Sequence, residues 1–168
     1  MLSKVLLSAL FALPALAQNG GIPGILATIT TDIRALNQSL TAFHGNDDAL
    51  SGILGNSNKL KSDLNAGTTQ ARSTPPLVFK DSLALAGSTA GLARDSNETI
   101  TTLISKKPDF DKIGASSIVV SLVKDLQTSA KDFSDAVVEK LPGEIAPVGD
   151  QLVGLINDGF ARGIKAYS

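Results

Sequence analysis

Seven apolar residues between positions 22 and 43 are spaced three or four residues apart without interruption. They are Ile22, Leu26, Ile29, Ile33, Leu36, Leu40 and Phe43. In an α-helix this spacing places all seven side chains on one face. The residues between them are mostly polar and uncharged. The segment is therefore predicted to be an amphipathic helix that buries one apolar stripe against other helices.

Four later segments repeat this spacing, and they cover residues 46–64, 74–104, 109–140 and 145–164. Residues 65–73 are small and polar and are expected to form a loop. Thr74, which precedes Pro75, is expected to start the third helix, because proline suits the first helical position. No segment alternates with the period of two that strands require. The pattern predicts an all-α protein, a five-helix bundle in one domain.

The composition excludes several classes of function. A chain of 168 residues is long enough to bury a hydrophobic core without staples. It contains no cysteine, so disulfides, thiolate metal sites and a cysteine nucleophile are impossible. Its formal net charge of -1 offers no electrostatic footprint for nucleic acid, so we expect no nucleic-acid partner.

The first 17 residues have the features of a secretory signal peptide. Lys4 is followed by an apolar run over residues 5–13, by Pro14, and by the small-x-small cleavage pattern of residues 15–17. The apolar run is too short to span a membrane, and no later segment is long enough, so no transmembrane segment is expected. We predict a signal peptide over residues 1–17 and a secreted helical domain over residues 18–168.

Two sequons make N-glycosylation possible in that compartment. They begin at Asn37, in Asn37-Gln38-Ser39, and at Asn97, in Asn97-Glu98-Thr99. Asn37 lies beside the apolar stripe of the first helix, whereas Asn97 falls on the stripe expected for the third. Both asparagines are glycosylation candidates, and an unmodified side chain is the alternative for each.

The stripe expected on the third helix contains unusually small residues. It consists of Phe79, Leu83, Ala86, Ala90, Ala93, Asn97, Ile100 and Ile104. Alanines at packing positions either let neighbouring backbones approach closely or leave unfilled volume. Both interpretations remain open from the sequence.

No reactive constellation is apparent. His44, the only histidine, lies near Asp47 and Asp48, but these residues are better explained as a helix end and the first turn of the next helix. No serine lies in a G-x-S-x-G elbow. The aspartate pairs 109 with 111 and 132 with 135 are expected on solvated positions, and the chain has no tryptophan to bind sugar. We expect no enzyme, no metal site and no cofactor.

The expected inner stripes supply candidate residues for a lipid site. These are Ile29, Ile33 and Leu36 of the first helix, Leu83, Ala86 and Ala90 of the third, Val119, Val123 and Leu126 of the fourth, and Leu152 and Ile156 of the fifth. Asn97, a polar residue on an inner stripe, needs a hydrogen-bond partner if it is buried, and a fatty-acid carboxylate is one candidate. A filled core is the alternative to a cavity.

Three features of the chain resemble a known family. They are the signal peptide before a cysteine-free helical domain, the segment Phe133-Ser134-Asp135-Ala136 leading into Glu139-Lys140-Leu141-Pro142, and the ending Ala166-Tyr167-Ser168. Together they resemble the fungal hydrophobic surface-binding protein A family, which includes cell-wall galactomannoproteins.

The resemblance implies a secreted, non-catalytic binding protein. Members of the family adsorb to hydrophobic surfaces and can recruit hydrolases there, and the mannoprotein relatives bind fatty acids inside a five-helix bundle. Cell-wall members often add a Ser/Thr-rich stalk and a lipid-anchor signal. The chain shows neither, so stable attachment to the cell wall is not expected from it, and looser association with the wall remains open.

The leading hypothesis is a secreted binder of long-chain lipid or of a hydrophobic surface. In one mechanism the bundle encloses an acyl chain; in the other the helices open and lay their apolar faces on the surface. The alternative is a helical protein-interaction module with a filled core, an effector or an adaptor for an extracellular hydrolase.

Overall fold

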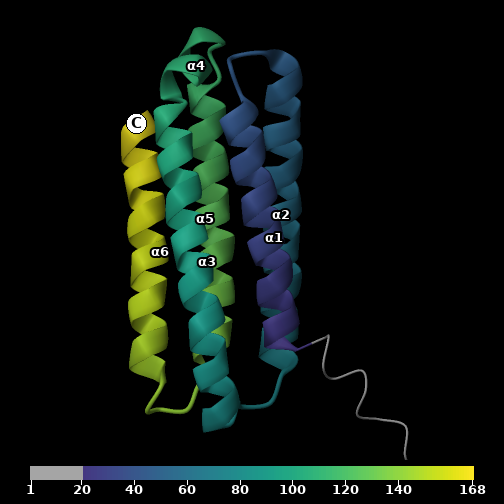
Figure 1. The fold of residues 1–168 in the computed structure, drawn as a ribbon, viewed down its shortest axis with the longest axis vertical. Helices are drawn as coiled ribbons and strands as arrows, with labels where there is room; N and C mark the ends of the chain where they lie inside the picture. The colour runs from purple at the N-terminus through teal and green to yellow at the C-terminus, as the bar shows by residue number, and fades with distance from the viewer. Residues whose placement is uncertain (1–20) are drawn as a thin grey trace, which may run out of the picture.

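The structure, a computed structural model, describes residues 21–168. Within this range it contains six α-helices (Figure 1). They are α1 (Ile22–Ala42), α2 (Asp47–Ser73), α3 (Phe79–Ser105), α4 (Lys107–Lys112), α5 (Ser116–Val138) and α6 (Ala146–Tyr167). The predicted signal peptide, residues 1–17, lies outside the described residues. The all-α class is confirmed, but the predicted number of five helices is wrong.

The additional helix arises from a break at Gly114. The segment 109–140 was predicted as one continuous helix, but it is divided between α4 and α5. Gly114 has a φ of +67°, in the left-handed region that glycine adopts without a Cβ clash. The amide of Ala115 then donates to the carbonyl of Phe110 at 2.9 Å. The apolar spacing is interrupted at this turn, because Ser116 and Ser117 lie three and four residues after Ile113. The prediction of one continuous helix did not take this interruption into account.

The second helix is longer than predicted. Residues 65–73, expected as a loop, form the last turns of α2, and Thr74 follows this helix instead of starting the next one. A Cβ on Gly67 would lie 2.7 Å from the side chain of Ile25 and 3.1 Å from that of Phe133. Glycine therefore lets α2 approach α1 and α5 closely, and this packing overrides the low helix propensity of the segment.

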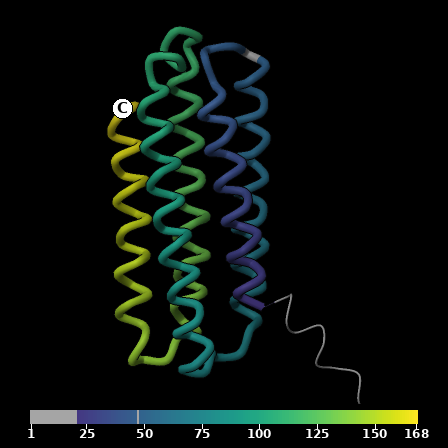
Figure 2. Tube along the Cα trace, in the orientation of Figure 1, coloured from purple at the N-terminus to yellow at the C-terminus, as the bar shows by residue number. Residues whose placement is uncertain are grey.

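The five long helices form a closed ring. α1 contacts α2 and α3, α2 contacts α5, and α6 contacts both α5 and α3. α1, α3 and α6 run in one direction along the bundle, and α2 and α5 run in the other (Figure 2). At an interaxial distance of about 10 Å, a regular ring of five places each axis about 8.5 Å from the centre, against about 7 Å for four. The central space of this bundle is therefore difficult to fill with side chains.

One end of the ring is closed by aromatic packing. Phe110 of α4 is fully buried, and its ring stacks on Phe43 with centroids 4.3 Å apart. The ring of Tyr167 packs edge-on against that of Phe110, with the ring centroids 6.0 Å apart. The Tyr167 hydroxyl donates to the carbonyl of Leu103 at 2.7 Å. This cluster fixes the ends of α1, α3 and α6 together.

Candidate functional site

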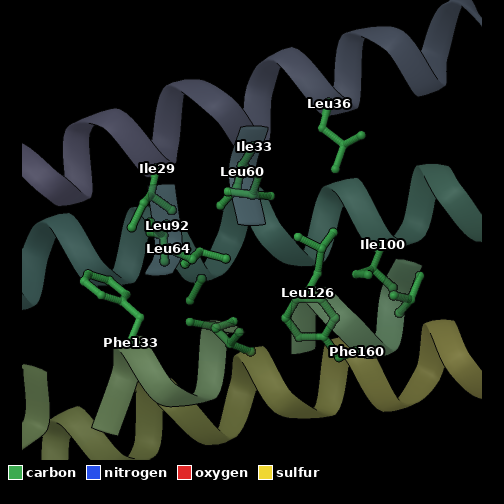
Figure 3. Close-up of a cluster of buried hydrophobic side chains, with 14 of the residues drawn as sticks. Ile29, Ile33, Leu36, Leu60, Leu64, Leu92, Ile100, Leu126, Phe133 and Phe160 are labelled. Atoms are coloured by element: carbon green, nitrogen blue, oxygen red, sulfur yellow. The ribbon is translucent and has the colours of Figure 1, made fainter. Parts of the chain in front are cut away.

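An apolar cavity of about 80 Å³ lies on the axis of the ring. All five long helices line it. Figure 3 shows side chains from opposite sides of the bundle, among them Ile33, Leu60, Ile100 and Leu126, that point into this interior. The volume is several times the about 10–15 Å³ that a single water needs. We refer to this space as the upper cavity.

A second space of about 50 Å³, the lower cavity, lies nearer the end of the bundle where α3 and α6 begin. It is lined by α1, α3, α5, α6 and the connection between α5 and α6. Leu92, Phe133, Ser134 and Ile156 line both cavities. The two spaces are therefore stacked along the axis, with these four side chains between them.

The walls of both cavities carry no charged side chain. Their polar groups are hydroxyls: Ser57, Ser96, Thr99 and Ser134 in the upper cavity, and Ser82, Thr89 and Ser134 in the lower. Thr99 donates to the carbonyl of Asp95 at 2.8 Å, and Thr89 to that of Leu85 at 3.0 Å. Within residues 21–168 the hydroxyls of Ser57, Ser96 and Ser134, which line the upper cavity, form no hydrogen bond with another residue. They are free to bind the polar end of a ligand.

Most of the candidate residues do line the cavities. Ile29, Ile33, Leu36, Val119, Val123 and Leu126 line the upper cavity, Ala86 and Leu152 line the lower, and Ile156 lines both. The stripe on α1 is buried throughout. The structure thus brings together residues from helices that are far apart in the sequence.

Three of the candidate residues on α3 lie outside the cavity walls, and Phe79 of the same predicted stripe is 51% exposed. Leu83 is 59% exposed, Ala90 is also exposed, and neither these two nor Asn97 line a cavity. The face that lines the cavities follows a different set at steps of three and four: Ser82, Leu85, Thr89, Leu92, Ser96, Thr99 and Leu103.

Sequence reasoning missed this face because four of its seven residues carry hydroxyls. A Ser or Thr side chain in a helix can donate to the carbonyl four residues earlier, which satisfies the hydroxyl without water. Ser82, Thr89 and Thr99 each do so. These residues can therefore face an apolar interior, although hydropathy places them outside. Hydroxyl residues and leucines that follow one another at steps of three and four are the signal that identifies the face.

Asn97 joins α3 to α6 outside the cavities. Its side-chain nitrogen donates to the carbonyls of Ala93 at 3.0 Å and Leu155 at 3.3 Å, and its oxygen accepts from Arg162 at 2.7 Å. A Cβ on Gly159 would lie 2.8 Å from that oxygen. The hydrogen-bond partners that the sequence suggested a ligand would supply are thus provided by α6. Glycosylation at Asn97 and at Asn37 stays a prediction.

The described residues offer neither a metal site nor a membrane-spanning helix. Between positions 21 and 168 no group of three or more histidine, cysteine or acidic side chains is placed to hold a metal ion. None of the helices described is long and apolar enough to cross a membrane. The cavities are therefore the principal candidate site of the described chain.

Comparison with known proteins supports a relationship to fungal surface proteins. Cell wall mannoprotein 1 of Aspergillus fumigatus is 30% identical over 144 residues, which cover 86% of this chain and 50% of that protein. Cell wall mannoprotein 1 of Aspergillus flavus is 26% identical over 157 residues, covering 93% of this chain and 57% of that protein. The chain spans about half the length of these relatives.

Two solved structures share the fold. AFMP4P in complex with palmitic acid superposes with a TM-score of 0.85 at 26% identity, covering 88% of this chain and 97% of that one. Ligand binding domain 2 of the Penicillium marneffei MP1 protein, complexed with multiple arachidonic acids, gives a TM-score of 0.84 at 26% identity, covering 87% and 93%. The likeness therefore extends over nearly the whole described bundle.

A family model gives the assignment. The model described as hydrophobic surface binding protein A matches residues 22–139, from the start of α1 to the end of α5. This match covers well over half of the chain, and it includes Phe133-Ser134-Asp135-Ala136, part of the resemblance noted in the sequence. The chain belongs to the hydrophobic surface binding protein A family.

Proposed function

We propose that residues 18–168 form a secreted, non-catalytic domain that binds long-chain fatty acids or related lipids along the axis of the bundle. The observation that carries this proposal is the pair of stacked apolar cavities without a charged wall residue. The structural neighbours bound to palmitic acid and to arachidonic acids support it. Relatives from the fungal cell wall support an extracellular or cell-wall location.

The dimensions of the site suit an extended acyl chain. The lining residues of α3 run from Ser82 to Leu103, which corresponds to about 32 Å along the helix axis. Each methylene transferred from water contributes about 0.8 kcal/mol before ordering costs. Empty apolar volume costs about 24 cal/mol per Å³, or about 3 kcal/mol for both cavities together. Filling the space with a ligand therefore stabilises the fold.

The polar end of the ligand has two suitable positions. Inside, the free hydroxyls of Ser96 and Ser134 can bind a neutral head group such as a protonated carboxyl. Burying an ionised carboxylate there without a cation would cost several kcal/mol. An ionised head group is therefore accommodated at the surface of the bundle, where it keeps its hydration.

A second function, adsorption to a hydrophobic surface, is supported by exposed apolar side chains. Val78, Phe79 and Leu83 at the start of α3 and Val148 and Leu155 on α6 are each between 44% and 62% exposed. α3 and α6 are neighbours in the ring. Exposed apolar residues on adjacent helices suit contact with an apolar surface.

The cavity is tested by filling it. Ala130 lines the upper cavity, whereas Ile118, on the same helix, is 45% exposed and lines neither cavity. Ala130→Phe is expected to weaken fatty-acid binding at least tenfold in a calorimetric titration, and Ile118→Phe to leave it unchanged. Thermal melts of both variants report whether the fold is retained.

Lipid extraction and native mass spectrometry of the secreted wild-type protein provide the complementary measurement. A bound fatty acid in wild type that is lost in Ala130→Phe supports the proposal. A wild-type protein that, after delipidation, neither takes up fatty acid nor adsorbs to a hydrophobic polymer contradicts both functions.

A further inference from the structure

The wall of the lower cavity is thin between α3 and α6. Val148 of α6 lines this cavity and is also 44% exposed to solvent. Ala86 of α3 and Leu152 of α6 line it as well, and both are half-buried. The same side chains thus reach the cavity on one side and solvent on the other. At this position the wall is a single side chain thick.

The neighbouring seam between α5 and α6 is closed. A Cβ on Gly149 would lie 2.8 Å from Leu141 Cδ1 and 3.2 Å from Val138 Cγ2. These side chains are packed directly against the α6 backbone, so a ligand cannot pass there without displacing both. On its α5 side the lower cavity is therefore bounded by side chains that pack directly against α6.

The seam between α3 and α6 is closed further along the helices. Asn97 donates to the carbonyl of Leu155 and accepts from Arg162, and its oxygen occupies the space beside Gly159. Beyond it, the side chain of Ile100 lies 3.4 Å from the position of a Cβ on Gly163. Hydrogen bonds and close packing thus join the two helices from Asn97 onwards.

Below Asn97 the two helices are joined differently. In the described part of the chain, every side-chain hydrogen bond between α3 and α6 involves Asn97 or the Tyr167 hydroxyl, which lies beyond it. The α3 residues on the seam near Val148 and Leu152 are the small Ala86 and, one turn on, the exposed Ala90. Separating the helices here breaks no side-chain hydrogen bond between them and uncovers mainly apolar surface.

We propose that this seam, bounded by Ala86, Val148 and Leu152, is the portal through which an acyl chain enters and leaves the bundle. The inference rests on the proposed lipid-binding function and adds its route. The chain enters methyl end first, because the path holds no charge and an ionised head group stays hydrated outside it. Asn97 holds α3 and α6 together above the portal, so that opening is confined to their N-terminal halves.

A portal controls rates without changing the bound state. Restricting it slows uptake and release by the same factor, because both directions cross the same barrier, and the dissociation constant stays constant. Loss of the lipid site has a different signature, because it raises the dissociation constant. One kinetic experiment therefore distinguishes a wrong assignment of the portal from a wrong assignment of the lipid-binding function.

The absence of cysteine allows a clean cross-link. In Ala86→Cys/Val148→Cys, a short bis-maleimide with a cleavable disulfide spacer joins α3 to α6 across the portal. The control is Lys61→Cys/Asp125→Cys, which joins α2 to α5. In the native protein the Lys61 ammonium lies 2.7 Å from Oδ2 of Asp125 at this position. Reduction of the spacer frees the helices but leaves the maleimide adducts, and so controls for their bulk.

Stopped-flow uptake and release of a fluorescent long-chain fatty acid are the readout. We expect both rates to fall at least tenfold in the cross-linked portal variant, relative to the same variant after reduction of the spacer, and the dissociation constant of that variant to be the same before and after reduction. The control cross-link is expected to change neither rate. Equal slowing in both variants, or no slowing in either, overturns the portal. If wild type binds no fatty acid, the proposed function itself fails.

Single substitutions provide a test that needs no cross-link. Val148→Asp places a charge in the portal, and Ile118→Asp places one at a site of nearly equal exposure, 45% against 44%, that lines neither cavity. Val148→Asp is expected to slow uptake and release at least fivefold, and Ile118→Asp to leave both rates unchanged. Unchanged rates in Val148→Asp contradict the portal.

Discussion

The ammonium of Lys59 on α2 lies 2.6 Å from Oδ1 of Asp32, a carboxylate that is buried on α1 and only 4% exposed. The same nitrogen lies 2.8 Å from Oδ2 of Asp63, one turn further along α2. Oδ2 of Asp32 is buried and has no hydrogen-bond partner. One exposed cation thus compensates a buried carboxylate incompletely, and the pairing of α1 with α2 is sensitive to the charge of Asp32.

This arrangement predicts a specific pH dependence of stability. Burial raises the pKa of Asp32 above its ordinary value, and the hydrogen bond from Lys59 offsets this only in part. Ionising Asp32 therefore costs more in the folded than in the unfolded protein, so its contribution to stability is lost as the pH rises above about 4. In urea unfolding between about pH 4 and pH 6, Asp32→Asn is expected to remove this decline.

The opposite shift of Asp63 acts in a different pH window. The hydrogen bond from Lys59 lowers the pKa of Asp63, so its contribution is present above about pH 4 and is lost on further acidification. A decline in the free energy of unfolding above about pH 4 therefore reports on the ionisation of Asp32. An identical pH dependence in wild type and Asp32→Asn over that window would contradict the assignment.

The contact between Asn97 and Gly159 predicts strong non-additivity. Asn97→Ala removes three hydrogen bonds and is expected to cost about 1–3 kcal/mol in the free energy of unfolding. Gly159→Ala is expected to destabilise the wild type, because its Cβ would lie 2.8 Å from the Asn97 oxygen. In the Asn97→Ala background that clash is absent, so the same change is expected to be neutral or stabilising.

Gly154 is the matched control on the same helix, because a Cβ there meets no atom within 4 Å. Gly154→Ala is expected to stabilise the protein by about 0.5–1 kcal/mol in both backgrounds through helix propensity. Chemical denaturation of the three single and two double variants measures the coupling. Additive effects of Asn97→Ala and Gly159→Ala would show that the contact does not constrain the α3–α6 seam.

The break between α4 and α5 depends on the left-handed backbone of Gly114. Gly114→Ala forces a Cβ into a conformation with φ of +67° and is expected to cost about 1–2 kcal/mol. Gly55, inside α2, also has open space around it but a helical backbone, so Gly55→Ala is expected to stabilise by about 0.5–1 kcal/mol. Thermal melts of the two variants should therefore shift in opposite directions.

Tyr167 is the only tyrosine, and the chain has no tryptophan, so its ionisation can be followed directly by ultraviolet absorbance. Burial raises the pKa of its phenol, which donates to the Leu103 carbonyl. The stability that this proton supplies is present below about pH 10 and is lost as the pH rises further. We expect phenolate to appear only together with unfolding, and Tyr167→Phe to cost about 1 kcal/mol at neutral pH.

Much of the candidate site was predictable where hydropathy and packing agree. Ile29, Ile33 and Leu36 line the upper cavity as their spacing predicts, because seven apolar side chains on one helical face are most stable when that whole face is buried. Leu83 and Ala90 were misplaced because the inner face of α3 is half hydroxyl. A hydroxyl that donates to a carbonyl of its own helix can be buried at little cost in free energy. A hydropathy scale counts it as polar and therefore wrongly places it on the outer face. The portal at Val148 could not be predicted, because it depends on the gap between two helices.

The sequence by itself determined the helical class, the buried face of α1 and the family, because each follows from local spacing or from residues read in order. Only the tertiary structure decided the turn at Gly114 and which face of α3 points into the bundle. It also decided the hydrogen bond from Arg162 to Asn97 and the closure of five long helices into a ring. These features depend on contacts between residues far apart in the chain, whose free energy exceeds local preference. The axial space follows from the ring, since five helices around one axis leave a centre that their side chains do not fill.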